Sequence, residues 1–327
     1  MSHALTDVRK IIKIGERSVG ITIPKEWLPL LGLSIGSSVE VTLASGYITI
    51  KPLSSTQPRP LLSVRIKSDD ASTLSRLIIA GYVEGFDMVV VESPRELARK
   101  AFYDVAMRLP GAIAMNGMHI TVKISVDEMN TNIDEVIASM KTTVDSMFDL
   151  LMDFFQTGDK SKLEQVIRLD DDLDRLHFLG VRTIKRTSFR NPQDALDNLI
   201  VIKSLEHIGD ALDRASNTLL RMGSATNDEC KRAFREMFAR VASYTSKSIN
   251  SFMNLNLELA IKVLMERQLI AQEIFTLAKG CIYSPETLAL VHEATVIIYE
   301  AAEIAEVATA KMVRRAEEKE VKVPQSL

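Results

Sequence analysis

The chain is poor in cysteine. Its 327 residues contain only Cys230 and Cys281, and neither belongs to a CxxC pair. Isolated cysteines in helical patterns are typical of reduced thiols in a cytosolic protein rather than of a disulfide framework. We therefore expect both thiols to be free.

Long apolar segments are also missing. No uncharged apolar run approaches the ~20 residues that a membrane-spanning helix needs, and residues 1–10 lack the apolar core of a secretory signal. These absences predict a cytoplasmic protein without membrane insertion. The apolar content of 46% and the charged content of 25% are those of an ordinary folded protein.

An excess of charge of one sign is absent as well. The formal net charge is −3, which excludes a uniformly basic nucleic-acid binder. The distribution is uneven, because residues 1–54 carry six basic and four acidic side chains, a local charge of +2 that leaves −5 for the rest. The sign of this difference suits a basic, nucleic-acid-binding segment joined to an acidic body.

The first 54 residues predict a small β-rich domain. Its expected elements are strands at 10–14 and 19–23, a helix at 25–31 opened by Pro24, and a hairpin of strands at 38–43 and 47–50. About 50 residues bury only a small core, so such a domain usually needs a partner to be stable.

A linker composition over 54–60 separates this domain from alternating strand and helix patterns. The expected elements are strands at 62–66, 88–91, 112–115 and 120–124, with helices at 71–85 and 94–109. They predict a small α/β module over 61–127. It holds no GxGxxG or P-loop motif, so nothing indicates nucleotide binding.

From about residue 130 the pattern is entirely helical, and it repeats. The expected helices span 132–156, 160–187, 192–222, 228–254, 258–279 and 285–319. Two sets of three long helices predict a duplicated three-helix bundle over 130–322. The expected fold class is therefore multidomain and mainly α, with a β-rich N-terminal domain at 1–54.

Residues 8–53 contain several short motifs. They include Gly15 followed by Arg17, the Ile-Pro-Lys-Glu turn at 23–26, and the Gly-x-x-Val-x-Val hairpin that begins at Gly36. On these motifs the segment resembles the SpoVT-AbrB family of DNA-binding domains. The resemblance implies an intertwined, swapped-hairpin dimer that binds DNA through a basic face. The positions carried over are Arg9, Lys10, Lys13, Arg17 and Lys25.

These cations suit contacts to phosphates, and Arg17, on the tight turn, is the best placed to reach a base edge. Against this, five cations occur on many solvated surfaces, and Glu16 and Glu26 dilute the patch. A domain that serves only for dimerisation is the alternative.

Two acidic stretches mark the first helical repeat, Asp-Asp-Asp-Leu-Asp-Arg-Leu at 170–176 and Leu-Glu-His-Ile-Gly-Asp-Ala at 205–211. On these stretches residues 130–320 resemble PhoU, the regulator associated with phosphate uptake. In that family, carboxylates four residues apart on these two helices hold metal ions. The matching residues here are Asp170, Asp174, Glu206 and Asp210.

The residues support such a cluster independently. Each pair is spaced i,i+4 and so shares one helix face, while the apolar stripe of the third helix falls on other positions: Val201, Leu205, Ile208, Leu212, Ala215 and Leu219. Glu206, Asp210 and Asp213 are therefore expected outside the core. About four negative charges would repel one another without a cation.

The expected ligand is one divalent or trivalent metal ion in the first repeat. Oxygen ligands suit Mg²⁺ or Mn²⁺, and His177 and His207 nearby leave iron or zinc open. The alternative is a solvated, charged helix face without an ion, in which Arg175 and Arg214 neutralise part of the charge.

The second repeat departs from this pattern. Glu266 and Ile270 take the positions of Asp170 and Asp174, and Glu306 and Ala302 take those of Asp210 and Glu206. Half of the carboxylates are lost, so a second metal site is expected to be weak or absent.

Together these features predict a phosphate-responsive, DNA-binding regulator that is a homodimer or larger and is not an enzyme. The bundle would sense phosphate status through metal or through a partner, such as a phosphate transporter or signalling protein. The alternative is an adaptor without a DNA role that regulates a phosphate ABC transporter by protein contact. A metallo-hydrolase is disfavoured because no nucleophile–base pair accompanies the carboxylates and an exposed cluster lacks an enclosed pocket.

Overall fold

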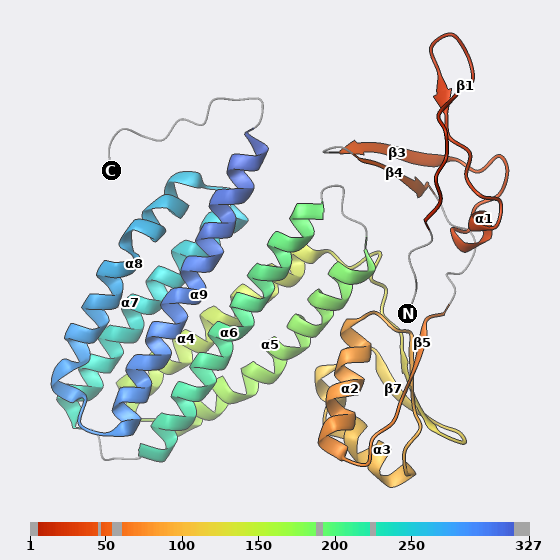
Figure 1. Cartoon of the computed structure of the whole chain (residues 1–327). Helices are drawn as coiled ribbons and strands as arrows, with labels where there is room; N and C mark the ends of the chain where they lie inside the picture. The colour runs from red at the N-terminus through yellow and green to blue at the C-terminus, as the bar shows by residue number, and fades with distance from the viewer. Residues whose placement is uncertain (1–5, 45–46, 54–60, 188–191, 223–226, 317–327) are drawn as a thin grey trace. The chain divides into compact units, whose positions relative to one another are not determined.

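The computed structural model describes residues 6–44, 47–53, 61–187, 192–222 and 227–316. The chain divides into two compact units, Met1–Leu61 and Leu62–Leu327 (Figure 1). The linker expected at 54–60 and the part of the last helix expected at 317–319 lie outside the described residues.

The first unit consists of two β-hairpins and a short helix. The hairpins are β1 (Ile12–Lys13) with β2 (Val19–Gly20) and β3 (Val39–Ala44) with β4 (Tyr47–Pro52), both antiparallel. Between them in sequence lies α1 (Trp27–Leu30). Gly32, two residues after its end, adopts the left-handed conformation (φ 65°) and terminates the helix. The first two strands are shorter than expected, and the amides of Ile14 and Gly15 donate to the carbonyl oxygen of Ser18 in the turn between them.

This first unit has almost no core of its own. Among its described residues, Leu33 is the only large hydrophobic side chain that is buried. The paired hairpin positions Leu43 and Ile48 are 79% and 65% exposed, and Val41, on the same face, is 61% exposed. An alternating strand pattern has therefore produced an apolar face that nothing in the described unit covers.

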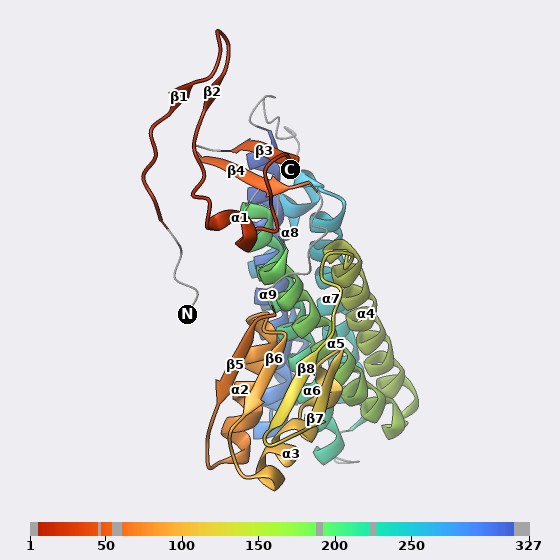
Figure 2. The same ribbon diagram turned by 90° about the vertical axis from the view of Figure 1, so that its right-hand side faces the viewer.

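The second unit begins with an α/β module. Its elements are β5 (Ser63–Ile66), α2 (Ala71–Val83), β6 (Met88–Val91), α3 (Arg95–Tyr103), the 3₁₀ turn η1 (Ala106–Arg108), β7 (Ala112–Asn116) and β8 (Ile120–Ile124). The sheet order is β5-β6-β8-β7, with β5 and β6 parallel and the other pairs antiparallel (Figure 2). Its core is formed by one face of the sheet and by α2 and α3, with Ile78, Val89, Phe102 and Val122 among its buried members.

The helix expected at 94–109 is broken in two. The chain leaves the helical conformation at Val105 (φ −122°), and η1 then completes the segment. This break lets Val105 and Leu109 both enter the module's core, at 4% and 2% exposure. It also places Arg108 at the surface that faces the helices.

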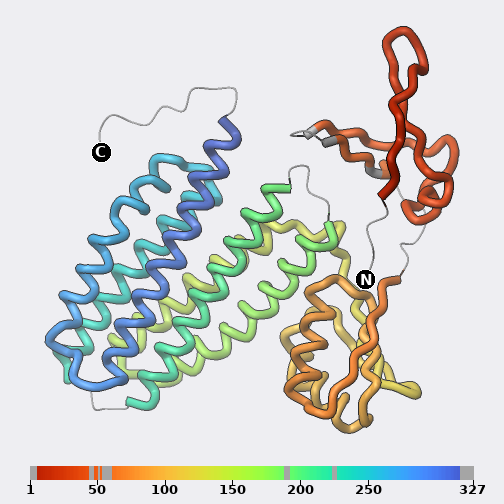
Figure 3. The backbone as a smooth tube through the Cα atoms, viewed as in Figure 1, coloured from red at the N-terminus to blue at the C-terminus, as the bar shows by residue number. Residues whose placement is uncertain are grey.

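Six long helices follow within the described residues (Figure 3). They are α4 (Ile133–Thr157), α5 (Lys160–Arg186), α6 (Pro192–Met222), α7 (Asp228–Met253), α8 (Leu257–Ala278) and α9 (Pro285–Arg315). Side chains at the N-caps accept backbone N–H groups and define the starts of five of them: Asn132, Asp159, Asn227, Asn256 and Ser284. The predicted helices are thus confirmed to within a few residues.

The helices form two bundles, α4–α6 and α7–α9, which share one continuous core. α6 packs along α9, and α4 packs against α7, as Figure 1 shows. The expected apolar stripe of α6, from Val201 to Leu219, is buried throughout. Of the described helices, none combines the length and the apolar character required to cross a membrane.

A buried arginine on α5 joins the module to the bundle. Arg182 is fully buried and forms an ion pair with Glu128 at 2.6 Å. It also donates hydrogen bonds to the carbonyl oxygens of Tyr82 and Phe86, at 2.8 and 2.9 Å. One turn later, Arg186 binds Asp87 at 3.0 Å. The C-terminal end of α5 is therefore anchored to the α/β module.

The expectation of free thiols is wrong, because Cys230 and Cys281 form a disulfide. Cys230 lies in the first turn of α7, and Cys281 lies in the 3₁₀ turn η2 (Lys279–Cys281) that follows α8. α7 and α8 are consecutive, packed helices of similar length, so the end of α8 returns to the start of α7 and brings the two Cα atoms to 5.5 Å. A sequence separation of 51 residues gave no sign of this proximity.

Candidate functional site

The four carboxylates predicted to bind metal gather at the edge between α5 and α6. Asp170 and Asp174 lie on α5, and Glu206 and Asp210 lie on α6. Gly209 permits this close approach: a Cβ atom there would stand 2.1 Å from Leu173 Cδ2 and 3.4 Å from Asp170 Oδ1. A larger residue at this position would require the Leu173 side chain to move within the α5–α6 interface.

Mutual repulsion and burial act on the whole cluster. Burial raises the pKa of Asp170 to about 7, and the neighbouring carboxylates, Asp213 first, add to the rise. Burial and Asp210 likewise raise the pKa values of Glu206 and Asp213. Ionising several carboxyl groups that lie this close together is unfavourable, and a bound cation would reduce this unfavourable free energy.

Two of the four carboxylates already contact arginine. Burial raises the pKa of Asp174, and Arg108 of η1, which donates to that carboxylate at 3.1 Å, reduces the rise. Arg214 donates to Asp210 at 3.1 Å and to Glu293 of α9 at 3.0 Å. The α/β module therefore contributes a cation directly to the acidic edge, a contact that no local sequence signal predicted.

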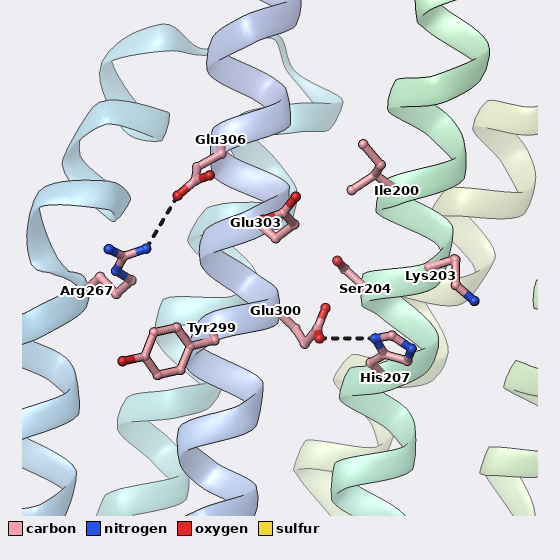
Figure 4. A pocket seen from close by; sticks show the side chains of 9 residues that line it. All are labelled: Ile200, Lys203, Ser204, His207, Arg267, Tyr299, Glu300, Glu303 and Glu306. Atoms are coloured by element: carbon pink, nitrogen blue, oxygen red, sulfur yellow. Dashed lines mark hydrogen bonds and ion pairs between the residues drawn. The ribbon is translucent and has the colours of Figure 1, made fainter.

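Glu206 connects this edge to a groove between α6 and α9. Its Oε2 atom has no hydrogen-bond partner among the described residues, although it lies 3.5 Å from Nε2 of His207, within ion-pair distance. The other ring nitrogen of His207 lies 3.1 Å from Glu300 of α9. Figure 4 shows His207 and Glu300 pointing toward one another across this groove, which has a volume of about 410 Å³.

The cluster fits a metal ion in its chemistry more than in its present geometry. Carboxylate oxygens are ligands for hard cations, and the unpartnered Glu206 Oε2 and the raised pKa of Asp170 both favour an added positive charge. Within the described ranges, however, no three Asp, Glu, His or Cys side chains converge as ligands of one ion. Asp174 and Asp210 would have to exchange their guanidinium partners for the metal.

The corresponding carboxylates of the second repeat are neutralised. Glu266 lies 3.5 Å from Lys247, and Glu306 lies 3.4 Å from Arg267. Ala302 is buried, and Ile270 packs against the helical core. The second repeat therefore replaces two acids with core residues and pairs each remaining one with a cation.

His177, one of the two histidines that leave iron or zinc open in the sequence, lies inside the bundle. Burial lowers the pKa of its imidazole to about 4, and its Nδ1 atom has no hydrogen-bond partner in the part of the chain that the structure describes. It is thus a neutral, buried histidine near neutral pH.

The predicted DNA contacts all lie on exposed positions of the first unit. Arg9 and Lys10 precede β1, Lys13 lies on β1, Arg17 lies in the bend between β1 and β2, and Lys25 precedes α1. Arg9 forms an ion pair with Asp7 at 2.5 Å, whereas the other four make no ion pair within the described residues. Four of the five cations thus belong to the first hairpin and the segment that leads into it.

Comparison with known proteins finds a matching family model for each of two regions of the chain. Residues 12–58 match the family model of "Antidote-toxin recognition MazE, bacterial antitoxin", an AbrB-like domain, and residues 137–218 match that of the PhoU domain. Both predicted resemblances are confirmed, and the PhoU match covers the first helical repeat, which carries the acidic edge. No curated protein matches the chain in sequence.

One solved structure is similar, a crystal structure of the phosphate transport system regulatory protein PhoU from Streptococcus pneumoniae. It is 14% identical, covers 58% of this chain and 96% of that one, and has a TM-score of 0.43. A likeness this distant supports no further conclusion.

Proposed function

We propose that this protein is a phosphate-responsive regulator of phosphate uptake, without catalytic activity, whose N-terminal unit dimerises and binds DNA. The helical bundle would sense phosphate status through a metal ion at the α5–α6 edge or through a partner protein. The MazE-type and PhoU matches on one chain support a regulatory role. The observation that carries the rest is a first unit with exposed cations and an uncovered apolar hairpin face.

The uncovered face supports a homodimer. Val41, Leu43 and Ile48 expose a contiguous apolar surface on a unit whose only buried large hydrophobic side chain, within the described residues, is Leu33. Apolar area of this kind is stabilised when another surface removes it from water. A second copy of the same hairpin supplies such a surface and would bring the cations of two chains onto one DNA duplex.

DNA binding is tested by fluorescence anisotropy on duplexes from upstream of phosphate-transport genes, across a salt series. Replacing Arg9, Lys13 and Arg17 together with alanine should weaken binding and reduce the slope of log K against log salt, by about 0.9 for each phosphate contact that is lost. A matched control replaces three exposed bundle cations that make no ion pair with described residues: Arg232, Arg240 and Lys262. Equal affinity for target and random duplexes, unaffected by the first triple variant, would contradict DNA reading.

That negative result would favour an adaptor that contacts a phosphate transporter through its bundle. The family that matches the N-terminal region is described by antidote–toxin recognition, and this supports the second candidate. In that case the first unit serves only to hold two copies together. Neutralising its cations would then leave both the dimer and its regulation of transport unchanged.

Metal binding is tested by metal analysis of protein reconstituted with Mn²⁺. We expect one ion per chain, held by Asp170, Asp174, Glu206 and Asp210, and its loss in the Asp170→Asn, Glu206→Gln double variant. The matched Glu266→Gln, Glu306→Gln variant alters the second repeat and should retain the ion. Equal occupancy of both repeats would contradict a single site, and absence of metal would favour sensing through a partner.

A further inference from the structure

A buried lysine on α9 lines a cavity that shares no residue with the acidic edge. Lys311 is 7% exposed, and its Nζ atom lies 4.5 Å from the centroid of the Phe252 ring. It forms no hydrogen bond and no ion pair with any residue in the described ranges. Charged side chains that are this deeply buried are rare unless they are paired.

Two carboxylates whose charges act on Lys311 are paired with another cation. Arg314 forms ion pairs with both Asp194, at 2.9 Å, and Asp197 on α6. These acids therefore stabilise the Lys311 ammonium only from a distance, while burial lowers the pKa of that group. Among the described residues, the ammonium contacts the face of the Phe252 ring and forms no ion pair.

The cavity beside Lys311 combines positive charge with an apolar wall. Its volume is about 200 Å³, and it is lined by Asp134, Ile137, Phe252, Met253, Leu255, Lys311 and Arg315. Arg315 is exposed, lies one turn after Lys311 on α9, and has no ion pair among the described residues. With one acid, Asp134, against two cations, the lining carries a net charge of +1.

We infer that this cavity binds a small organic monoanion, whose oxyanion head is held by Lys311 and Arg315 and whose short apolar body packs against Phe252 and Ile137. Two cations and one carboxylate match a single negative charge, and Asp134 would oppose a dianion. An apolar wall favours an organic anion over inorganic phosphate, which has no apolar surface to bury. The volume lies below the ~300–1,000 Å³ of pockets for larger ligands, so the body must be short.

Such a site lies in the same compact unit as the acidic edge but shares no residue with it. It would give the regulator a second input, an organic acid, that is independent of metal and of DNA. The inference does not depend on the proposed role in phosphate uptake.

The test uses isothermal titration calorimetry of the full chain with sodium butyrate, against sodium chloride at matched ionic strength and against inorganic phosphate. We expect saturable butyrate binding, and at least a tenfold weaker affinity in Lys311→Met. This variant removes an unpaired buried charge and keeps the volume, so its melting temperature should stay equal or rise. Lys262→Met, at an exposed position of α8, is the matched control and should bind like the wild type.

Arg315→Gln provides a second variant that leaves the core untouched, because this side chain is exposed. It should also weaken butyrate binding, by several-fold. The inference is overturned if butyrate gives no more heat than chloride, if phosphate binds and butyrate does not, or if both variants bind butyrate like the wild type.

Discussion

The two units of this chain bury their apolar side chains in different ways. In the helical unit, residues far apart in sequence meet in one core, where Val144, Leu205, Phe234 and Ile297 are all fully buried. In the N-terminal unit, Val41 and Leu43 alternate with polar residues as regularly as any strand requires, yet both remain exposed. Regular patterning thus specifies which face of an element is apolar. Within one chain, that face is buried only where the chain supplies a second apolar face to pack against it.

The strongest way to break this comparison is a charge on the uncovered hairpin. Leu43→Asp should prevent dimerisation, because a carboxylate buried in the dimer interface would have no partner. We expect at least a hundredfold weaker dimer, measured by sedimentation equilibrium. Glu40→Lys, an equally drastic charge change on the opposite face of β3, should leave the dimer intact. A Leu43→Asp protein that stays dimeric would place the interface elsewhere.

The helical unit is tested at its junction with the α/β module. Arg182→Met leaves Glu128 buried with only its longer ion pair to Arg186, at 3.7 Å, and should cost about 3–5 kcal/mol of unfolding free energy. Chemical denaturation measures the loss, and the added change Glu128→Leu should restore much of it. Lys185 lies on the same helix as Arg182 and forms a more exposed ion pair with Glu84. Lys185→Met should therefore cost no more than about 1 kcal/mol of unfolding free energy. Equal losses in the two single variants would contradict the importance of burial.

The disulfide is a smaller contribution to the same unit. Closing a loop between Cys230 and Cys281, 51 residues apart, restricts the unfolded chain and should stabilise the fold by about 2–4 kcal/mol. Cys230→Ala and Cys281→Ala should each lower the melting temperature to the same extent. A reductant should lower that of the wild type and leave both variants unchanged. Insensitivity of the wild type to reductant would show that the bond does not form in solution.

The smallest expected effect concerns the acidic edge. With a pKa raised to about 7, Asp170 keeps its proton in the folded protein at pH values where the unfolded chain has lost it. This group therefore stabilises the fold at pH 6 relative to pH 8, and the effect is lost as pH rises through 7. Because the side chain is partly exposed, we expect about 1 kcal/mol after allowing for solvent screening.

The comparison of wild type with Asp170→Asn in chelator-treated protein isolates that effect. His177, whose pKa is lowered to about 4, makes the fold more stable as pH rises from 4 to 6.5, and both proteins share this contribution. The stability difference between the two proteins should change by about 1 kcal/mol from pH 6 to pH 8. A constant difference would contradict the raised pKa. Added Mn²⁺ should stabilise the wild type at pH 8 and not the variant.

The resemblance to PhoU and the residue spacing together identified the carboxylates of the candidate site. The i,i+4 pairs Asp170–Asp174 and Glu206–Asp210 share helix faces by geometry, and the third-helix stripe from Val201 to Leu219 is buried as predicted. What spacing could not supply were partners from other elements. Arg108 comes from a module 66 residues before Asp174, and Glu300 comes from α9, 93 residues after His207.

The sequence by itself determined where the long helices begin and end and which faces of the helices and strands are apolar, because caps, turns and periodicity act over a few residues. The order of the domains and the loss of carboxylates in the second repeat followed from the same local reading. Only the tertiary structure decided which faces meet: the bond between Cys230 and Cys281, the burial of Arg182 against Glu128, and the enclosure of Lys311. These contacts depend on which distant elements pack side by side. The packing of the whole core determines this, and no local pattern does.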